Sequence, residues 1–192
     1  MGTTTMGTTW MAGILLTTAF IGAGHPSAAQ DKGKTDAAEL QGASQAALDK
    51  LYSTTQLAKE LGPKAQATLV FPKVTKAGLG IGGQYGEGSL LKNGTAVAYY
   101  KTTGASFGLQ AGGQQYGYAM FFMNAKALDD FVNASGFEVG VGPSVVLVDE
   151  GKAKTMTSTT MKEDIYAFVF GQKGLMAGLG VQGNKITKIT PK

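Results

Sequence analysis

Ser106 is the residue of this sequence best suited by type and spacing to covalent chemistry. It lies in Gly104-Ala105-Ser106-Phe107-Gly108, which matches the Gly-x-Ser-x-Gly nucleophile elbow of serine hydrolases. A serine of that kind needs a histidine base later in the chain, whereas the only histidine, His25, precedes it. A serine–lysine pair would instead need a desolvated lysine, which a sequence does not reveal. We therefore interpret Ser106 as a small residue in a glycine-rich strand, and keep a serine hydrolase as the less favoured alternative.

Two glycine motifs could in principle hold a nucleotide phosphate. Residues 78–83 and 178–183 both satisfy Gly-x-Gly-x-x-Gly. A dinucleotide site needs a helix that begins at the glycines. The first copy is followed by Gln-Tyr-Gly-Glu-Gly and the second by the β-prone Asn-Lys-Ile-Thr-Lys-Ile-Thr. The surroundings predict sheet, in which glycine lets strands bend, bulge or pack closely. We expect no cofactor.

Acidic side chains occur as neighbouring pairs rather than as a ligand set. The pairs are expected on a helix, in a turn and before a strand, so solvated positions explain them, and no alternating Asp-x-Asp-x-Asp calcium loop is present. The chain has no cysteine, which excludes thiolate chemistry and cysteine metal sites. We expect no metal site. The pairs are Asp129-Asp130, Asp149-Glu150 and Glu163-Asp164.

All 17 basic residues are lysine, and the net charge is +4. Without arginine, bidentate recognition of phosphate or of guanine edges is not available. No aromatic residues interleave with the lysines in the way that stacks single-stranded bases. These features argue against nucleic acid as a partner. Lysines beside an apolar element are typical of contact with an anionic membrane surface, although ordinary solubilising charge explains them equally well.

The chain divides into a leader, a linker and one domain. Residues 11–24 form an apolar run of the length of a secretory signal core, followed by the small residues Ser27, Ala28 and Ala29. No lysine precedes this run, so a disordered leader is the alternative. We predict an export signal or disordered leader over 1–29, a linker over 30–35 and a domain over 36–192. We expect no transmembrane helix in the mature chain.

The domain is predicted to begin with helix and continue as sheet. Apolar spacing indicates helix over residues 36–61, with a break near Ser53–Thr55 and an end at Gly62-Pro63. Asn124 is a predicted N-cap for a short helix over 125–132, with Leu128, Phe131 and Val132 on one side.

Short strands with tight turns make up the rest of the predicted domain. Asn93-Gly94 is a type I′ hairpin signal, and the apolar run 116–123 is expected to be a central strand. Pro72 should end the first strand or place it at a sheet edge. We predict an α+β domain with a sandwich or barrel-like antiparallel sheet. The expected strands are 67–71, 77–84, 88–91, 95–102, 106–110, 116–123, 137–141, 144–148, 164–170, 175–182 and 185–190.

The order of five motifs resembles the SYLF domain, a lipid-binding family. They are Leu-Val-Phe-Pro-Lys-Val-Thr-Lys-Ala-Gly-Leu-Gly-Ile-Gly-Gly at 69–83, Gly-Ser-Leu-Leu at 88–91, Thr-Thr-Gly-Ala-Ser-Phe-Gly-Leu-Gln-Ala-Gly at 102–112, Gly-Val-Gly-Pro-Ser-Val at 140–145 and Gly-Leu-Met-Ala-Gly-Leu-Gly-Val-Gln-Gly at 174–183. With the leading helix, the resemblance covers residues 36–189. It implies a compact mixed fold and lipid binding, with acidic phosphoinositides as ligands of eukaryotic members and an amphipathic N-terminal helix taking part. Bacterial members are mostly exported proteins of the envelope. Some fungal members bind actin, which we do not expect of this arginine-free chain.

These observations predict a non-enzymatic protein that binds acidic phospholipid headgroups or an anionic membrane surface. We expect export to the periplasm or outer membrane of a bacterium. Binding would combine lysine–phosphate attraction with insertion of apolar residues from the leading helix. A structural or protein-interaction role in the envelope is the other alternative. The predicted headgroup contacts are Lys50, Lys59, Lys64, Lys73 and Lys76.

Overall fold

The computed structural model describes residues 36–138, 145–148, 162–174 and 183–191. At residues 79–80, 106–111 and 174 it describes the backbone alone. All of these residues belong to one compact unit, Lys32–Lys192. The predicted leader and linker, residues 1–35, lie outside the described residues. The elements are α1 (Ala37–Thr54), α2 (Gln56–Leu61), the 3-10 helix η1 (Gly62–Lys64), β1 (Ala67–Lys92), β2 (Thr95–Phe122), α3 (Ala125–Asn133), β3 (Phe137–Glu138), β4 (Val145–Val148), β5 (Ile165–Gly174) and β6 (Lys185–Ile189).

The leading helix begins and breaks where the sequence predicts. The Asp36 carboxylate accepts a hydrogen bond from the backbone N–H of Ala38 at 2.7 Å, which caps the first turn of α1. Thr55 is extended, with φ −132° and ψ 99°, and separates α1 from α2. The predicted break between two helices is confirmed.

β1 and β2 form one long antiparallel ribbon rather than the several short strands expected. The turn between them is Asn93-Gly94, with φ of 52° and 78°, as the Asn-Gly signal predicts. Pro72 lies inside β1 at an irregularity between Phe71 and Val74, so the strand continues past it. Among the described strands β1 pairs with β2 alone, so the missing N–H of Pro72 is tolerated at a sheet edge.

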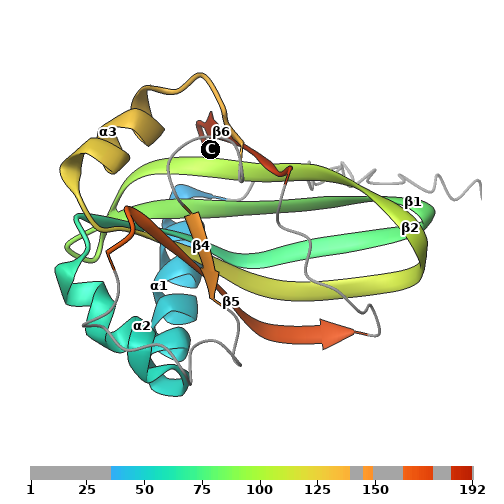
Figure 1. The fold of residues 1–192 in the computed structure, drawn as a ribbon, viewed down its shortest axis with the longest axis horizontal. Coiled ribbons are helices and arrows are strands. Elements are labelled where there is room, and N and C mark those ends of the chain that lie inside the picture. The colour runs from blue at the N-terminus through green and yellow to red at the C-terminus, as the bar shows by residue number, and fades with distance from the viewer. Residues whose placement is uncertain (1–35, 139–144, 149–161, 175–182, 192) are drawn as a thin grey trace, which may run out of the picture. The chain divides into compact units, whose positions relative to one another are not determined.

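Glycines let this ribbon bend back on itself (Figure 1). A Cβ at Gly78 would overlap the backbone of Gly82, which places the bend in the glycine run of β1. Beyond the bend, a Cβ at Gly88 would overlap the carbonyl oxygen of Val70. The glycine-rich stretch therefore does not interrupt the strand. It allows the second half of β1 to pack closely against the first half.

Among the described residues, the sheet has six strands in the order β3-β6-β2-β5-β4, with β1 paired to β2 beside this path. β6 pairs with the first half of β2 and β5 with the second half, so the bent β2 curls the sheet. All pairs are antiparallel except β4 with β5, which is parallel and differs from the all-antiparallel expectation. The architecture confirms the predicted α+β class and the central position of residues 116–122.

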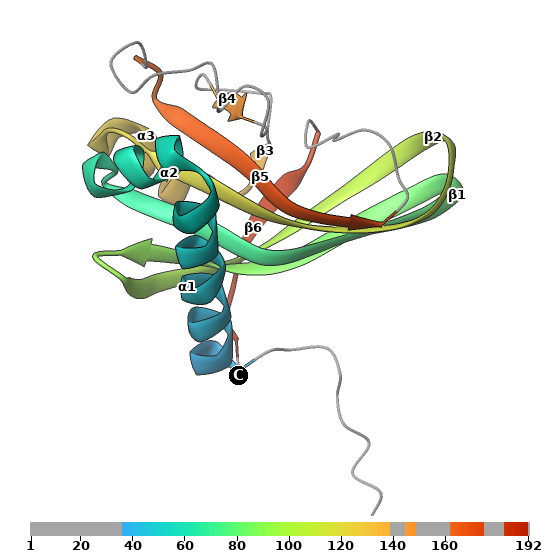
Figure 2. The ribbon, with the colours of Figure 1, turned by 90° about the horizontal axis from the view of Figure 1, so that it is seen from below.

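The curled sheet buries both of its faces. Alternate residues of β2 and β5 point into the curl, where they form an inner core with Phe71, Val74 and Ile186. The intervening residues point outward and pack against α1 and α2, which cross the outer face (Figure 2). This two-sided burial explains why the run at 116–122 has no polar face.

α3 covers part of the inner core. Its N-cap is Asn124, whose side-chain oxygen accepts the backbone N–H of Ala127 at 2.8 Å, as predicted. Phe131 is buried with its ring centroid 4.9 Å from that of Phe122. Val132 is 38% exposed, so its predicted place on the packed side is wrong, and Ala127 takes that place.

Candidate functional site: a lysine-lined pocket beside α1

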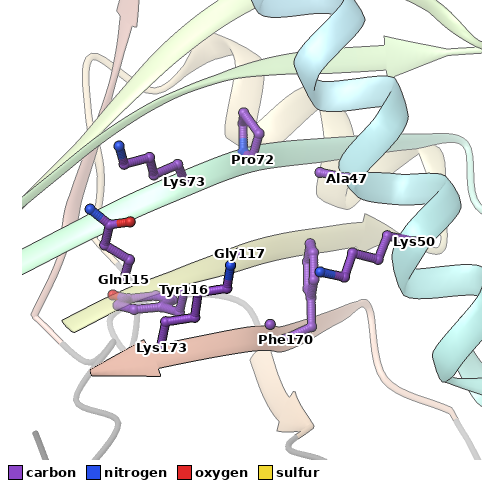
Figure 3. Close-up of a pocket in the computed structure, with 10 residues that line it drawn as sticks. Ala47, Lys50, Pro72, Lys73, Gln115, Tyr116, Gly117, Phe170 and Lys173 are labelled. Atoms are coloured by element: carbon purple, nitrogen blue, oxygen red, sulfur yellow. The ribbon is translucent and has the colours of Figure 1, made fainter. Parts of the chain in front are cut away.

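Three lysines from distant parts of the chain surround a pocket of about 200 Å³ between α1 and the sheet (Figure 3). Lys50 comes from α1, Lys73 from β1 and Lys173 from β5. In Figure 3, Lys50 extends from the helix toward the sheet, and Lys173 rises from β5 toward Gly117. The remaining lining residues are Ala47, Pro72, Gln115, Tyr116, Gly117, Phe170 and Gly171.

The packing of each element fixes its lysine. Leu48 and Leu51 of α1 are buried against the outer face of the sheet, which holds Lys50 at the rim of the pocket. The buried Ser44 hydroxyl adds a hydrogen bond to the carbonyl oxygen of Val70 at 3.3 Å. Lys73 follows the irregularity at Pro72 in β1.

Glycine shapes the floor of the pocket. The ring of Phe170 covers Gly117 so closely that a Cβ there would overlap it. Gly171 has φ 61°, a conformation that favours glycine, and the β2–β5 register shifts between Gln115 and Gly117. This local distortion of β5 comes immediately before Lys173.

The charge in the pocket is positive and unpaired. Lys50, Lys73 and Lys173 are exposed, and none forms an ion pair with an acidic side chain among the described residues. No acidic residue lines the pocket. Burial raises the pKa of the Tyr116 phenol to about 12, so this group is neutral at physiological pH. Like-charged ammonium groups around an open pocket attract an anion, and phosphate suits lysine as a compact point-charge donor.

A second pocket, of about 280 Å³, lies on the other side of Lys73 and has the opposite character. Glu39 and Glu87 line it together with Tyr85. The Tyr85 hydroxyl donates a hydrogen bond to the Glu87 carboxylate, and burial followed by this bond raises the Tyr85 pKa to about 12. An anion is therefore favoured on the Lys50 and Lys173 side alone.

The five predicted lysines divide into three groups. Lys50 and Lys73 meet in the pocket. Lys59 on α2 and Lys64 on η1 are exposed but do not line it. Lys76 is only 4% exposed, so its side chain is not offered to a surface.

The expected strand ends at residue 170, so the sequence does not indicate Lys173 as part of a site. The alternation of β5 continues to Gly174, and only the fold brings Lys173 to α1. No pattern within the sequence links these two regions.

Ser106 and the first glycine motif lack the geometry that their chemistry needs. Ser106 lies inside β2 opposite Gly82, whereas a nucleophile elbow places its serine on a strand-to-helix turn. His25 and residues 175–182 of the second glycine motif lie outside the described residues. The first glycine motif lies in the bend of β1, with no helix after it.

One carboxylate of each acidic pair that the structure describes has a structural partner. Asp130 pairs with Lys126 at 2.6 Å, and Asp164 accepts a hydrogen bond from the Asn124 amide at 2.6 Å. Asp149-Glu150 lies outside the described residues. Within the described part of the chain, no group of three or more acidic or histidine side chains could hold a metal ion. No helix there is long and apolar enough to cross a membrane.

The fold and the pocket define an α+β domain with a curled sheet and a cationic pocket under its leading helix. Residues 103–190 match the family model described as Ysc84, Las17-binding protein actin regulator. This match agrees with the SYLF domain family that the sequence motifs resemble. The search of curated proteins returned no match.

Proposed function

We propose that this domain is a non-enzymatic protein that binds the phosphate groups of an anionic lipid surface. The observation that carries the proposal is the convergence of Lys50, Lys73 and Lys173 on one pocket without an acidic partner. The match to the SYLF-type family model over residues 103–190 is compatible with lipid binding. Each lysine close to an anionic surface contributes about 1 kcal/mol of attraction, so three together give a useful but reversible affinity.

The pocket lysines, rather than the apolar face of the helix, make the proposed contact. Leu40, Leu48 and Leu51 of α1 are all buried against the sheet, so they are not free to enter a bilayer while the helix stays docked. The proposed mechanism is therefore electrostatic, with phosphate oxygens accepting hydrogen bonds from the lysine ammonium groups.

Lys59 and Lys64 keep a secondary role in the proposal. Both are exposed and raise the local positive charge. This charge attracts an anionic surface when the two are separated by no more than about a Debye length. Lys76 is left out because it is buried.

We also propose the bacterial envelope as the place of action. The support is the signal-like run at residues 11–24 and the small residues after it. A protein partner in the envelope is the alternative. It would show as a stable complex in which the lysine pocket is dispensable.

Vesicle co-sedimentation tests the lipid proposal. The full chain should bind vesicles that contain an acidic phospholipid, bind neutral vesicles much less, and lose binding as salt rises. Equal binding to both vesicle types, unaffected by salt, would contradict it.

A further inference from the structure

The interior of the curled sheet changes from apolar to polar toward the bend of the ribbon. Side chains on one face of a strand are two residues apart. Each inner-core residue therefore has a neighbour on the same face, one step closer to the bend. On β1, Val74 is followed by Lys76. On β2, Tyr116 is followed by Gln114 and Tyr100 by Thr102. At β6, Ile186 is preceded by Asn184, and the second half of β1 contributes the buried Gln84.

Lys76 is the only charged side chain in this polar set, and it lacks a counter-charge. It is 4% exposed, and its register partner across the ribbon is the neutral Gln114. Within the described residues it forms no ion pair. A buried ammonium group is unfavourable unless an opposite charge or several acceptors compensate it.

The surrounding polar groups are only partly satisfied by one another. The Tyr116 hydroxyl donates to Gln84 Oε1 at 2.9 Å, and the Gln84 amide donates to Asn184 Oδ1. Gln114 Oε1 and Thr102 Oγ1 are buried without a hydrogen-bond partner, as are the hydroxyls of Tyr100 and Tyr118 in the adjoining inner core. Buried polar atoms of native proteins are nearly all hydrogen-bonded, so these atoms indicate a missing partner.

We propose that the polar end of the curled sheet is a binding site for a protonated phosphate group, held by Lys76. The phosphate oxygens accept from the Lys76 ammonium and the Thr102 hydroxyl. The phosphate O–H donates to Gln114 Oε1, so one group partners the Lys76 charge and the buried oxygens of Gln114 and Thr102. A phosphodiester has no O–H to donate to Gln114 Oε1, so it is a poorer fit. The ligand is free phosphate or a phosphomonoester headgroup.

This site is separate from the lysine pocket and does not rest on the proposed function. Lys73 is exposed and lines the outer pocket, whereas Lys76 points into the curl among inner-core residues. Variants can therefore remove either site alone.

Thermal unfolding of the full chain in inorganic phosphate, against chloride at equal ionic strength, tests the proposal. The melting temperature of the wild type should rise with the logarithm of phosphate concentration. Lys76→Met keeps an unbranched side chain of similar length. In chloride its melting temperature should be at least that of the wild type, and phosphate should no longer raise it. Thr102→Val should reduce the rise. The Lys50→Gln/Lys73→Gln/Lys173→Gln variant should keep it.

The inference is overturned if the wild type shows no phosphate-dependent rise, or if Lys76→Met keeps it. If Lys76→Met does not fold, the Thr102→Val variant decides. A phosphate-dependent rise in its melting temperature as large as that of the wild type overturns the proposal. Vesicles that contain phosphatidic acid distinguish the source. Weaker binding by Lys76→Met than by wild type identifies a lipid phosphomonoester, and equal binding with loss of the phosphate effect identifies free phosphate.

Discussion

Gly88 lies directly against the backbone of Val70, so that a Cβ at position 88 would overlap the Val70 carbonyl oxygen. This contact joins the two halves of a single strand, β1, after the bend at its glycine run. The Val70 carbonyl also accepts the Ser44 hydroxyl of α1 at 3.3 Å. The close approach therefore supports both the curl of the sheet and the docking of the helix that carries Lys50.

We predict that Gly88→Ala strongly destabilises the fold. The added methyl group has backbone atoms as its neighbours, so the two halves of β1 must separate, and overpacking of this kind costs about 1–3 kcal/mol or more. Gly42→Ala is the matched control, because nothing lies within 4 Å of a Cβ at that helical position. It should stabilise the chain by about 0.5–1 kcal/mol. Urea unfolding measures both changes, and an equal free energy of unfolding for the two variants would refute the close approach.

The buried Tyr116 phenol should make the free energy of unfolding fall at alkaline pH. Burial raises its folded-state pKa to about 12 from 10.0, so the unfolded chain releases the proton first. The stabilisation is complete below pH 10 and is lost as pH rises toward 12. Burial also raises the pKa of the Tyr118 phenol.

Tyr116→Phe removes one of these groups. Between pH 9 and 11.5 the variant should lose roughly 2 kcal/mol less of its free energy of unfolding than the wild type. Comparison of the two slopes cancels the titration of the lysines. Identical slopes would show that Tyr116 is not buried as described. The loss of its 2.9 Å hydrogen bond to Gln84 should lower the stability at pH 9 by about 1 kcal/mol.

Ser106 should not react as a catalytic serine. It lies inside β2, paired with Gly82 of β1, and we expect no labelling by a serine-reactive fluorophosphonate. Heat-denatured protein serves as the background control. Labelling of the native chain that disappears in Ser106→Ala would restore the hydrolase alternative.

Local signals in the sequence predicted the local structure well. The Asn124 cap, the break between the first two helices near Thr55 and the Asn93-Gly94 turn each depend on a few neighbouring residues, and all are confirmed. The length of the strands was not predictable in the same way. Glycine and proline read as breaks, but in β1 they produce a bend and an irregularity inside a continuous strand.

The candidate site was only half predictable for a similar reason. Lys50 and Lys73 are predicted from their places at the leading helix and the first strand, and both line the pocket. Lys173 reaches them because β5 pairs with β2, which is a long-range contact. Lys76 lies on the opposite face of β1 from Lys73. It is three residues from Lys73, and only the register of β1 reveals that it points inward.

The central claim is that the pocket lysines bind an anionic lipid surface, and vesicle binding by two charge-matched variants tests it most directly. One variant is Lys50→Gln/Lys73→Gln/Lys173→Gln, and the other removes three exposed lysines outside the pocket, Lys59→Gln/Lys64→Gln/Lys92→Gln. At about 1 kcal/mol for each lysine, the pocket variant should lose on the order of 100-fold in affinity for acidic vesicles, and the second variant much less. Equal losses in the two variants, or wild-type binding by the pocket variant, would contradict the claim.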